Sequence, residues 1–407
     1  MAAQKEGLFY GWWVVIGSFL LLSCAYGTQL YAFPVFFDEM IRDMGWTRAQ
    51  TAASLSISGL VFGVLSPIIG VLIHKARIRF VMIGGCILGG VGFYLLSTVT
   101  ELWQFYIFYG LVLTTGIALI AVVPNMAIVQ SWFVEKRSIA LGVTSAGIGF
   151  GGVVMAPVAR WLISMYGWQT SFLFLAAIIV LIGIPVSAII MRTPEEKKLS
   201  PVKKQEGDNG GSVTGFALTQ AMRKKAFWFI SVAMMFWAWS YMIGLTHQVA
   251  FAVDIGLEKM AAAGAISLLT AFSIPGRLGF GKLGDIIDKR YVFMIGTSLQ
   301  VVAFFVLLAT TNMTMLYIYS FLLGLNIGGM SPILPGIIAD YFGQKHFGAI
   351  YGFTIFATYI GMAIGPVYGG WIFDVTNSYF IAFLTSIVLS FIAIVLVYLA
   401  KKPAEEP

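Results

Sequence analysis

The chain has 407 residues, of which 59% are hydrophobic and only 11% are charged, and its mean hydropathy is +0.89. Soluble domains carry about 25% charged residues, so this composition excludes an ordinary water-soluble domain and places most of the chain against lipid or in a lipid-buried core. The net charge of +7 does not indicate nucleic-acid binding, because the basic residues do not gather on one face.

Twelve apolar stretches follow one another, and each is long enough to form a membrane-spanning helix. They cover residues 10–37, 47–73, 78–98, 101–130, 138–164, 168–191, 226–253, 260–284, 291–309, 313–339, 347–373 and 378–400. The first stretch is too long for a cleaved signal peptide, so we expect it to be retained. Cys24 and Cys86 lie in separate stretches without metal-ligand spacing, so we expect two buried thiols and no metal. The sequence predicts an all-α polytopic membrane protein with 12 transmembrane helices.

The basic residues divide unequally between the two sides of the membrane that these helices define. With the N-terminus inside, 20 of the 25 Lys and Arg residues lie on the inner side, one lies within a span, and four lie outside. The four outer residues are Arg42, Arg48, Arg160 and Lys259. By the positive-inside rule, we expect both termini in the cytoplasm and the protein in the plasma (inner) membrane.

One hydrophilic stretch, 192–225, divides the chain into two six-helix halves, 1–191 and 226–407. It is too polar to span and too short for a domain, so we interpret it as a cytoplasmic linker. The halves repeat each other, since residues 156–174 align without a gap with residues 365–383. Two parallel six-helix repeats are typical of transporters whose site lies at the interface of the halves near the middle of the membrane.

Arg277 is the most informative single residue. It lies in an apolar stretch eight residues before Asp285, which is roughly 12 Å along a helix in a hydrocarbon layer about 30 Å thick. A cation there is costly and faces the protein interior or a water-filled cavity, and arginine does not shed its proton. We interpret Arg277 as an anion site. The alternative is a structural arginine bonded to backbone carbonyls.

His247 is a second ionisable side chain well inside a span, seven residues before Asp254. Its helix is the counterpart of the first helix, and an imidazole can take up a proton near neutral pH. We predict a role in substrate binding or proton coupling. The alternative is a hydrogen-bonded interior histidine.

Several polar or aromatic residues in apolar stretches are weaker candidates for substrate contacts, because a monocarboxylate needs a few placed donors in a mostly apolar cavity. They are Gln29, Tyr31, Asn125, Asn326, Tyr359 and, as part of the cavity wall, Phe356. For each polar residue the alternative is a helix–helix hydrogen bond. GIGFGG at 147–152 looks like a dinucleotide fingerprint, but it lies in a membrane helix, so close helix packing is favoured.

The loop GKLGDIIDKR at 281–290 resembles the signature loop of the major facilitator superfamily. Glycines there let two helices cross closely, and the acidic residue can cap or pair across the cytoplasmic end of the bundle. The residues of this expected cytoplasmic gate are Gly281, Gly284, Asp285, Lys289 and Arg290. The corresponding loop of the first half, residues 70–79, lacks the acidic residue.

A more specific resemblance is carried by WFVEKRSIALGVTSAGIGFGG at 132–152, which is similar to the fifth-helix signature of the monocarboxylate porter family. Tyr10-Gly11-Trp12 resembles part of the first-helix motif of that family, and Arg277 followed by Gly281 also fits. The resemblance covers essentially the whole chain. It implies a major facilitator fold that moves small carboxylates, with Arg277 as the substrate-binding arginine.

Three positions depart from the relatives of this family. Tyr31 stands where animal monocarboxylate transporters carry a lysine, and Ser273 stands where they carry an aspartate. Thr358 stands where bacterial oxalate–formate exchangers carry a second cation. One buried cation suits one carboxylate, so the sequence favours a monoanion over oxalate.

These observations predict a secondary active transporter and not an enzyme. We expect it to take up a small monocarboxylate such as lactate or pyruvate together with a proton, by alternating access in a lipid bilayer, without a cofactor. The missing lysine and aspartate leave an alternative, an organic-anion exchanger or uniporter without proton coupling. A transporter-like sensor would be expected to carry an added soluble output domain.

Overall fold

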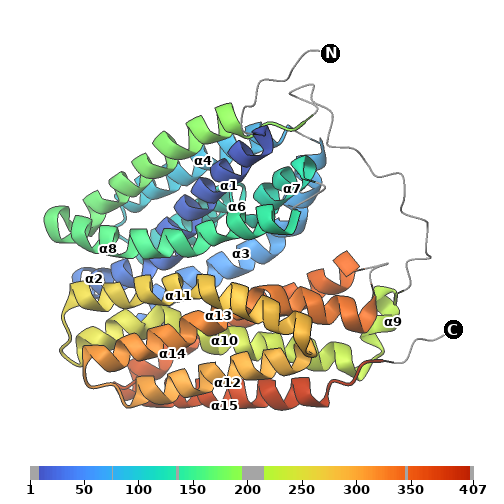
Figure 1. The fold of residues 1–407 in the computed structure, drawn as a ribbon. Helices are drawn as coiled ribbons and strands as arrows, with labels where there is room; N and C mark the ends of the chain where they lie inside the picture. Colours follow the sequence, from blue (N-terminus) through green and yellow to red (C-terminus); the bar gives the residue numbers. More distant parts are fainter. Residues whose placement is uncertain (1–8, 76, 134–136, 195–214, 344–346, 404–407) are drawn as a thin grey trace.

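The computed structural model describes residues 9–75, 77–133, 137–194, 215–343 and 347–403. Within these ranges the chain forms helices joined by short connections, which confirms the expected all-α class (Figure 1). The helices are long because each apolar run has to satisfy its backbone hydrogen bonds within its own span. They gather into two bundles, one from each half of the sequence.

The first bundle contains the helical segments up to residue 190. They are α1 (Tyr10–Tyr26), the π-helical turn η1 (Gly27–Tyr31), α2 (Phe33–Met44), α3 (Arg48–Lys75), α4 (Ile78–Leu96), α5 (Leu102–Phe105), η2 (Tyr106–Leu113), α6 (Thr114–Ala118), α7 (Val122–Trp132), α8 (Arg137–Ile178), η3 (Ile179–Gly183) and η4 (Val186–Ile190). The first span is thus built from α1, η1 and α2 in series, and the fourth from α5, η2, α6 and α7.

The continuous segment Ile139–Ile190 contains two spans. As one straight helix its 52 residues would be more than twice as long as the hydrocarbon layer is thick, at about 1.5 Å per residue. The chain reverses at Gly167, whose φ of 76° and ψ of 165° are not helical, and α8 doubles back in Figure 1. The described residues contain 11 apolar segments of spanning length, and counting the two arms of this one separately gives the expected twelve crossings.

The second bundle begins with a short helix and continues with six long ones. They are α9 (Leu218–Met222), α10 (Lys225–Asp254), α11 (Lys259–Ile286), α12 (Lys289–Leu308), α13 (Met313–Phe342), α14 (Phe347–Thr376) and α15 (Phe380–Leu399). Polar side chains cap three of these helices at their first turn: Glu258 on α11, Asp288 on α12 and Asn312 on α13.

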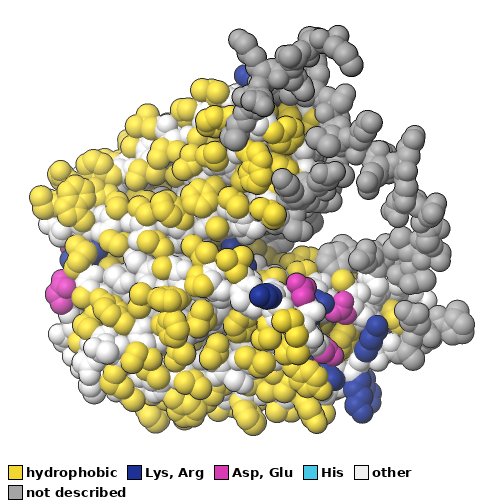
Figure 2. Space-filling view, viewed as in Figure 1, with side chains coloured by type: hydrophobic (Ala, Val, Ile, Leu, Met, Phe, Trp, Pro, Cys, Tyr) yellow, Lys and Arg dark blue, Asp and Glu magenta, His cyan; other side chains and the backbone are white. Residues whose placement is uncertain are grey.

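The two bundles meet along a seam in which α3 packs on α14, α8 on α11 and α2 on α10. They are in contact at the end formed by residues 38–48, 254–259 and 374–379, which we call the closed end. Toward the end where the chain termini lie, which we call the terminus end, the bundles diverge (Figure 1). On the face shown in Figure 2, hydrophobic side chains cover much of both bundles, and the acidic and basic side chains lie near the two ends and along the seam. The molecule is a multi-pass membrane protein.

Glycines reveal the internal repeat in three dimensions. A Cβ added at Gly151 of α8 would lie 2.2 Å from the carbonyl oxygen of Ser23 in α1, and one added at Gly361 of α14 would lie 2.0 Å from that of Met235 in α10. These pairs join corresponding helices in the two bundles. At Gly147 the added Cβ would lie 2.3 Å from a backbone oxygen of α1, so the GIGFGG run serves close helix packing.

Part of the predicted linker 192–225, residues 195–214, lies outside the described residues, as do residues 134–136 of the fifth-helix signature. The end of the linker packs on the second bundle. Phe216 is 7% exposed, its N–H donates to the carbonyl oxygen of Phe342 (2.9 Å), and α9 follows it. This part of the expected tether belongs to the fold of the second half.

Candidate functional site

A cavity of about 140 Å³ lies between the two bundles. Helices α1 and α3 line it from one side, and α10 and α14 line it from the other. Its wall is largely apolar and includes Leu30, Leu55, Phe62, Met242 and Met362. A site of this kind accepts a small molecule with an apolar body and leaves recognition to a few polar groups at its margin.

Gln29 is one of these polar groups, and the π-helical turn η1 positions it. In this turn the N–H of Ala32 bonds to the carbonyl oxygen of Gly27 (3.0 Å), five residues back. The side-chain nitrogen of Gln29 donates to the hydroxyls of Ser58 (3.0 Å) and Thr114 (2.8 Å). The structure thus places Gln29 in the cavity wall with its amide nitrogen engaged.

Two of the predicted tyrosines also lie at the cavity or beside it. Tyr359 lines the cavity. Tyr31, the last residue of η1, is 4% exposed. Neither Tyr31 nor Arg277 is among the residues that line the cavity.

Arg277 lies in α11 at the seam. It is half-buried, and its Nη1 donates to the carbonyl oxygen of Ser145 in α8 (2.7 Å), across the boundary between the halves. Its Nε is buried and has no hydrogen-bond partner among the described residues. A buried donor left unpaired costs about 1–3 kcal/mol, and more for a charged group. The guanidinium is therefore only partly satisfied by the protein.

His247 does not line the cavity. It is fully buried in α10, and both ring nitrogens are bonded: Nε2 to the carbonyl oxygen of Pro366 (2.8 Å) and Nδ1 to the hydroxyl of Tyr379 (3.1 Å). Because a carbonyl only accepts, Nε2 carries the proton and Nδ1 accepts from the tyrosine. In this conformation His247 belongs to the closed end, and its predicted roles in substrate binding and proton coupling remain predictions.

The structure places the other three candidates away from the cavity wall. Asn125 donates to the carbonyl oxygens of Ile120 (2.7 Å) and Ala121 (2.8 Å), just before its own helix. Asn326 accepts from Trp237 Nε1 (3.0 Å) and donates to a backbone oxygen of α12 (2.7 Å). The bonds of Asn326 join α13 to α10 and α12, which is the helix–helix alternative to substrate contact, whereas those of Asn125 stay within its own span. Phe356 is 45% exposed and is not part of the cavity wall.

In the expected gate motif at the terminus end, Gly284 is the closely packed glycine. A Cβ added there would lie 3.0 Å from Ile333 of α13, whereas one at Gly281 would meet nothing closer than 3.9 Å. Asp285 is exposed and makes no ion pair or hydrogen bond with any residue that the structure describes. The capping role expected of it is taken by Asp288, which accepts from the N–H of Arg290 (2.8 Å).

Lys289, the other basic residue of the motif, pairs with a carboxylate of the same half. Its Nζ lies 2.7 Å from Asp340 Oδ2 in α13. The motif therefore joins α12 to α13, and its side-chain hydrogen bonds stay within the described part of the second half.

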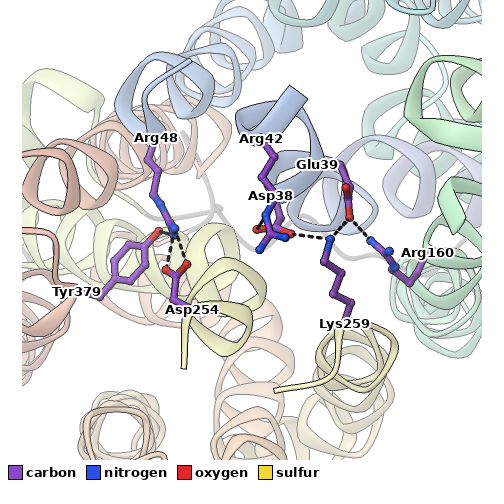
Figure 3. A network of polar contacts seen from close by, with 8 residues as sticks. All are labelled: Asp38, Glu39, Arg42, Arg48, Arg160, Asp254, Lys259 and Tyr379. Carbon is purple, nitrogen blue, oxygen red and sulfur yellow. Dashed lines mark hydrogen bonds and ion pairs between the residues drawn. The ribbon is translucent and has the colours of Figure 1, made fainter. Parts of the chain in front are cut away.

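The closed end holds a charged network that the sequence reasoning missed (Figure 3). Glu39 in α2 accepts from Arg160 of its own half (2.6 Å) and from Lys259 of the other half (2.5 Å). Asp38 lies 3.7 Å from Lys259 and 3.5 Å from Arg42. Lys259 thus bridges the two halves at this end.

A second part of the network centres on Arg48, the first residue of α3. Its Nη2 bonds to Asp254 (2.7 Å) and its Nη1 donates to the hydroxyl of Tyr379 (2.5 Å), both in the other half (Figure 3). Asp374 accepts from the backbone N–H groups of Arg48 (3.0 Å) and Ala49 (2.9 Å). The sequence does hold one signal for this network. Acidic residues such as Asp38, Asp254 and Asp374 lie at the same ends of the predicted spans as the basic residues Arg42, Arg48, Arg160 and Lys259.

The sequence profile of the Major Facilitator Superfamily matches residues 19–290 and 250–407. The chain belongs to the Major Facilitator Superfamily. The members of this superfamily that resemble the chain are transporters and not enzymes. Among the described residues, no group of three or more His, Cys, Asp or Glu side chains is placed to hold a metal ion.

Within the superfamily, the chain is related to proteins named monocarboxylate transporters. It is 26% identical to Monocarboxylate transporter 13 of Rattus norvegicus, over 93% of this chain and 86% of that protein. It is 25% identical to Monocarboxylate transporter 12 of Mus musculus, over 97% of this chain and 87% of that protein. It is 24% identical to Monocarboxylate transporter 4 of Gallus gallus, over 97% of this chain and 85% of that protein.

Solved structures of the superfamily share the fold. A bacterial homologue of the human lysosomal transporter Spinster, in an inward-facing and occupied conformation, superposes with a TM-score of 0.73 at 15% identity and covers 97% of each chain. A mutant of the nucleoside transporter NupG superposes with a TM-score of 0.73 at 13% identity, over 96% of this chain and 98% of that one. The major facilitator fold of two six-helix halves expected from the sequence is confirmed.

Proposed function

We propose that this superfamily member transports a small monocarboxylate, of the size of lactate or pyruvate, together with a proton by alternating access. Arg277 binds the carboxylate, and the cavity takes the rest of the substrate. The protein lies in the plasma (inner) membrane with both termini in the cytoplasm, so that the closed end faces outward. The linker 192–225 tethers the two halves, which rock against each other around the site.

The observation that carries this proposal is the incomplete bonding of Arg277. Its guanidinium lies at the seam, makes one bond to a backbone oxygen, and keeps a buried Nε that has no partner among the described residues. A carboxylate is the ligand that satisfies two donors of this fork at once. The relation to monocarboxylate transporters points to the same chemistry.

The surroundings of Arg277 favour a monoanion. Ser273, four residues before it, is buried and donates to a backbone oxygen of its own helix (2.6 Å). Thr358 in α14 donates to Thr354 (2.9 Å). Neither position brings a second charge, and the cavity wall is apolar, so a second carboxylate would have no partner there.

Proton coupling is assigned to His247, whose ring can carry the charge that offsets the anion. An organic-anion exchanger or uniporter without proton coupling is the second candidate. Two observations favour it: both nitrogens of His247 are bonded in a neutral ring, and Arg277 has no acidic partner among the described residues.

The test is uptake of labelled lactate into proteoliposomes, with and without an inward acid gradient. We expect gradient-stimulated uptake that falls by about tenfold or more in Arg277→Lys, because lysine keeps the charge but loses the fork. Arg223→Lys is the matched control, since Arg223 is exposed and lies outside the seam; it should transport like the parent.

Three results would change the proposal. Normal uptake by Arg277→Lys would exclude direct binding of the carboxylate by this residue. Uptake that ignores the pH gradient but needs an internal anion would make the protein an exchanger. Uptake that needs neither would make it a uniporter.

A further inference from the structure

His247 lies in a continuous chain of hydrogen bonds that starts at the seam. Arg48 Nη1 donates to the hydroxyl oxygen of Tyr379 (2.5 Å), and this hydroxyl donates to His247 Nδ1 (3.1 Å). His247 Nε2 in turn donates to the carbonyl oxygen of Pro366 (2.8 Å). The ring of Phe37 packs edge-on against the imidazole, with 5.3 Å between the centroids. In this geometry the imidazole of His247 carries one proton, on Nε2, and is neutral.

Arg48 is held firmly at its end of the chain. Its Nη2 is 2.7 Å from the carboxylate of Asp254, and its guanidinium carbon lies 3.8 Å from the centroid of the Phe373 ring. Its side chain is 11% exposed. All these partners belong to the second half, whereas Arg48 belongs to the first, so the chain exists only while the two halves meet at the closed end.

The charged groups around His247 do not favour a second proton on it. They are Asp254 on its own helix, Asp374 on α14, Asp38 on α2 and Arg48 on α3. Asp254 is bonded to the side chain of Arg48 and Asp374 to its backbone N–H, while Asp38 is paired elsewhere in the network. Of the four, Arg48 is the one joined to His247 through the hydroxyl of Tyr379.

A proton added at Nδ1 would reverse the bond to Tyr379. The tyrosine oxygen would then accept from two cations, Arg48 and the imidazolium, and its own proton would lose its acceptor. In a site from which water is excluded, this repulsion is weakly screened. Docking of Arg48 and protonation of His247 therefore oppose each other.

We propose that Arg48 and Tyr379 are positioning residues that couple closure of the outer end to loss of the proton from His247. This inference rests on the proton coupling of the proposed function. When the closed end opens, Arg48 leaves Tyr379 and His247 takes a proton from outside. When Arg48 docks again, that proton is released, and it leaves on the inner side together with the substrate.

The test compares net uptake with exchange of labelled lactate in proteoliposomes, for Tyr379→Phe and Arg48→Gln. Exchange returns the loaded carrier and requires no proton release, whereas net uptake requires the carrier to return without its proton. We expect exchange within about twofold of the parent and net uptake lowered by about fivefold or more, the lower range of typical coupling between two sites. Raising the internal pH should restore net uptake by drawing the proton from His247.

Two variants control for loss of a hydroxyl or of an ion pair. Tyr368→Phe removes a hydroxyl that bonds to Thr385, and Arg160→Gln removes a cation that pairs with Glu39 at the same end. Neither residue touches His247, so both should keep the parent's dependence on internal pH, whatever their rates.

Parent-like net uptake in both test variants would overturn the inference and leave the proposed function standing. The inference would also be overturned if Arg160→Gln changed the dependence of net uptake on internal pH in the same way. The change in pH dependence would then reflect the stability of the closed end alone. Loss of both fluxes in folded Tyr379→Phe would also overturn it, and if that variant does not fold, Arg48→Gln decides. A parent protein whose Arg277-dependent uptake ignores the pH gradient would overturn proton coupling and this inference together.

Discussion

Asp374 of the second half caps the helix that begins at Arg48 in the first half. Its two carboxylate oxygens accept from the backbone N–H groups of Arg48 and Ala49, at 3.0 and 2.9 Å. Thr47, the residue just before the helix, provides the usual N-cap by accepting from the N–H of Gln50 (3.2 Å), and Asp374 adds a second cap from a helix more than 300 residues away. The first turn of α3 is therefore satisfied in this way only while the closed end is closed.

Asp374→Ala should shift the protein toward a conformation in which the closed end is open. Loss of a capping carboxylate costs about 1 kcal/mol, which is about a fivefold change in the ratio of closed to open molecules. The measurement is the distance distribution between spin labels at Gln50 and Val375, in a background in which Cys24 and Cys86 are replaced by serine. Asp43→Asn is the control, because Asp43 bonds to Trp168 within one half. An unchanged distribution in Asp374→Ala would show that this cap does not hold the end closed.

Lys259→Met should open the same end, because Lys259 brings one cation to both Asp38 and Glu39 across the seam. The pair is partly exposed, so the expected effect is about 1 kcal/mol, and it should shrink in 1 M salt, where the Debye length falls to about 3 Å. The same spin-label distances report it. Arg42→Met should have little effect, since Arg42 pairs within its own helix and its side chain is 49% exposed. Equal effects of the two substitutions would contradict a bridging role for Lys259.

Gly151→Ala should destabilise the first half. Its new methyl group would lie 2.2 Å from the carbonyl oxygen of Ser23, so α8 and α1 would have to move apart, at about 1–3 kcal/mol for an overpacked contact. Thermal unfolding in detergent measures the change. Gly142→Ala on the same helix is the control, because its Cβ would meet nothing within 4 Å and alanine favours a helix over glycine. A stability order in which Gly142→Ala is the less stable variant would refute the packing argument.

Asp288→Ala should lower the stability of the second half by about 1 kcal/mol, because Asp288 caps α12. Asp285→Ala should be nearly neutral, since Asp285 is exposed and makes no ion pair or hydrogen bond with the described residues. Thermal unfolding compares the two variants directly. A larger loss for Asp285→Ala would return the structural role in this loop to the residue that the sequence suggested.

The sequence predicted the fold well because a bilayer leaves few choices. Spans have to be long, apolar and internally bonded, so composition marks them, and the boundary between residues 164 and 168 already located the reversal at Gly167. The sequence did not reveal the π-helical turn at Gly27–Tyr31, because the helix before it is apolar on all sides and has no hydrophobic stripe whose phase an extra residue would visibly shift.

The site was predicted less completely, because composition does not tell which face of a helix a polar residue occupies. Gln29 and Tyr359 line the cavity, whereas Asn125 and Asn326 bond to backbone and side chains inside one half. The charged network at the closed end was missed for a different reason. Its partners come from helix ends that are neighbours only after the two halves have met, and nothing in the local sequence around Asp374 signals that meeting.

The wide turn in the first span sets the angular phase between two distant parts of the same helix. Gln29 and Tyr31 lie in the turn, and Asp38 and Glu39 follow it by two turns in α2. If the same residues were wound as a regular α-helix, everything beyond Tyr31 would be rotated by about 100° around the helix axis. Glu39 would then face away from Lys259. A single inserted residue thus sets the alignment of the cavity and the closed end along one span, so that a rotation of this span moves both.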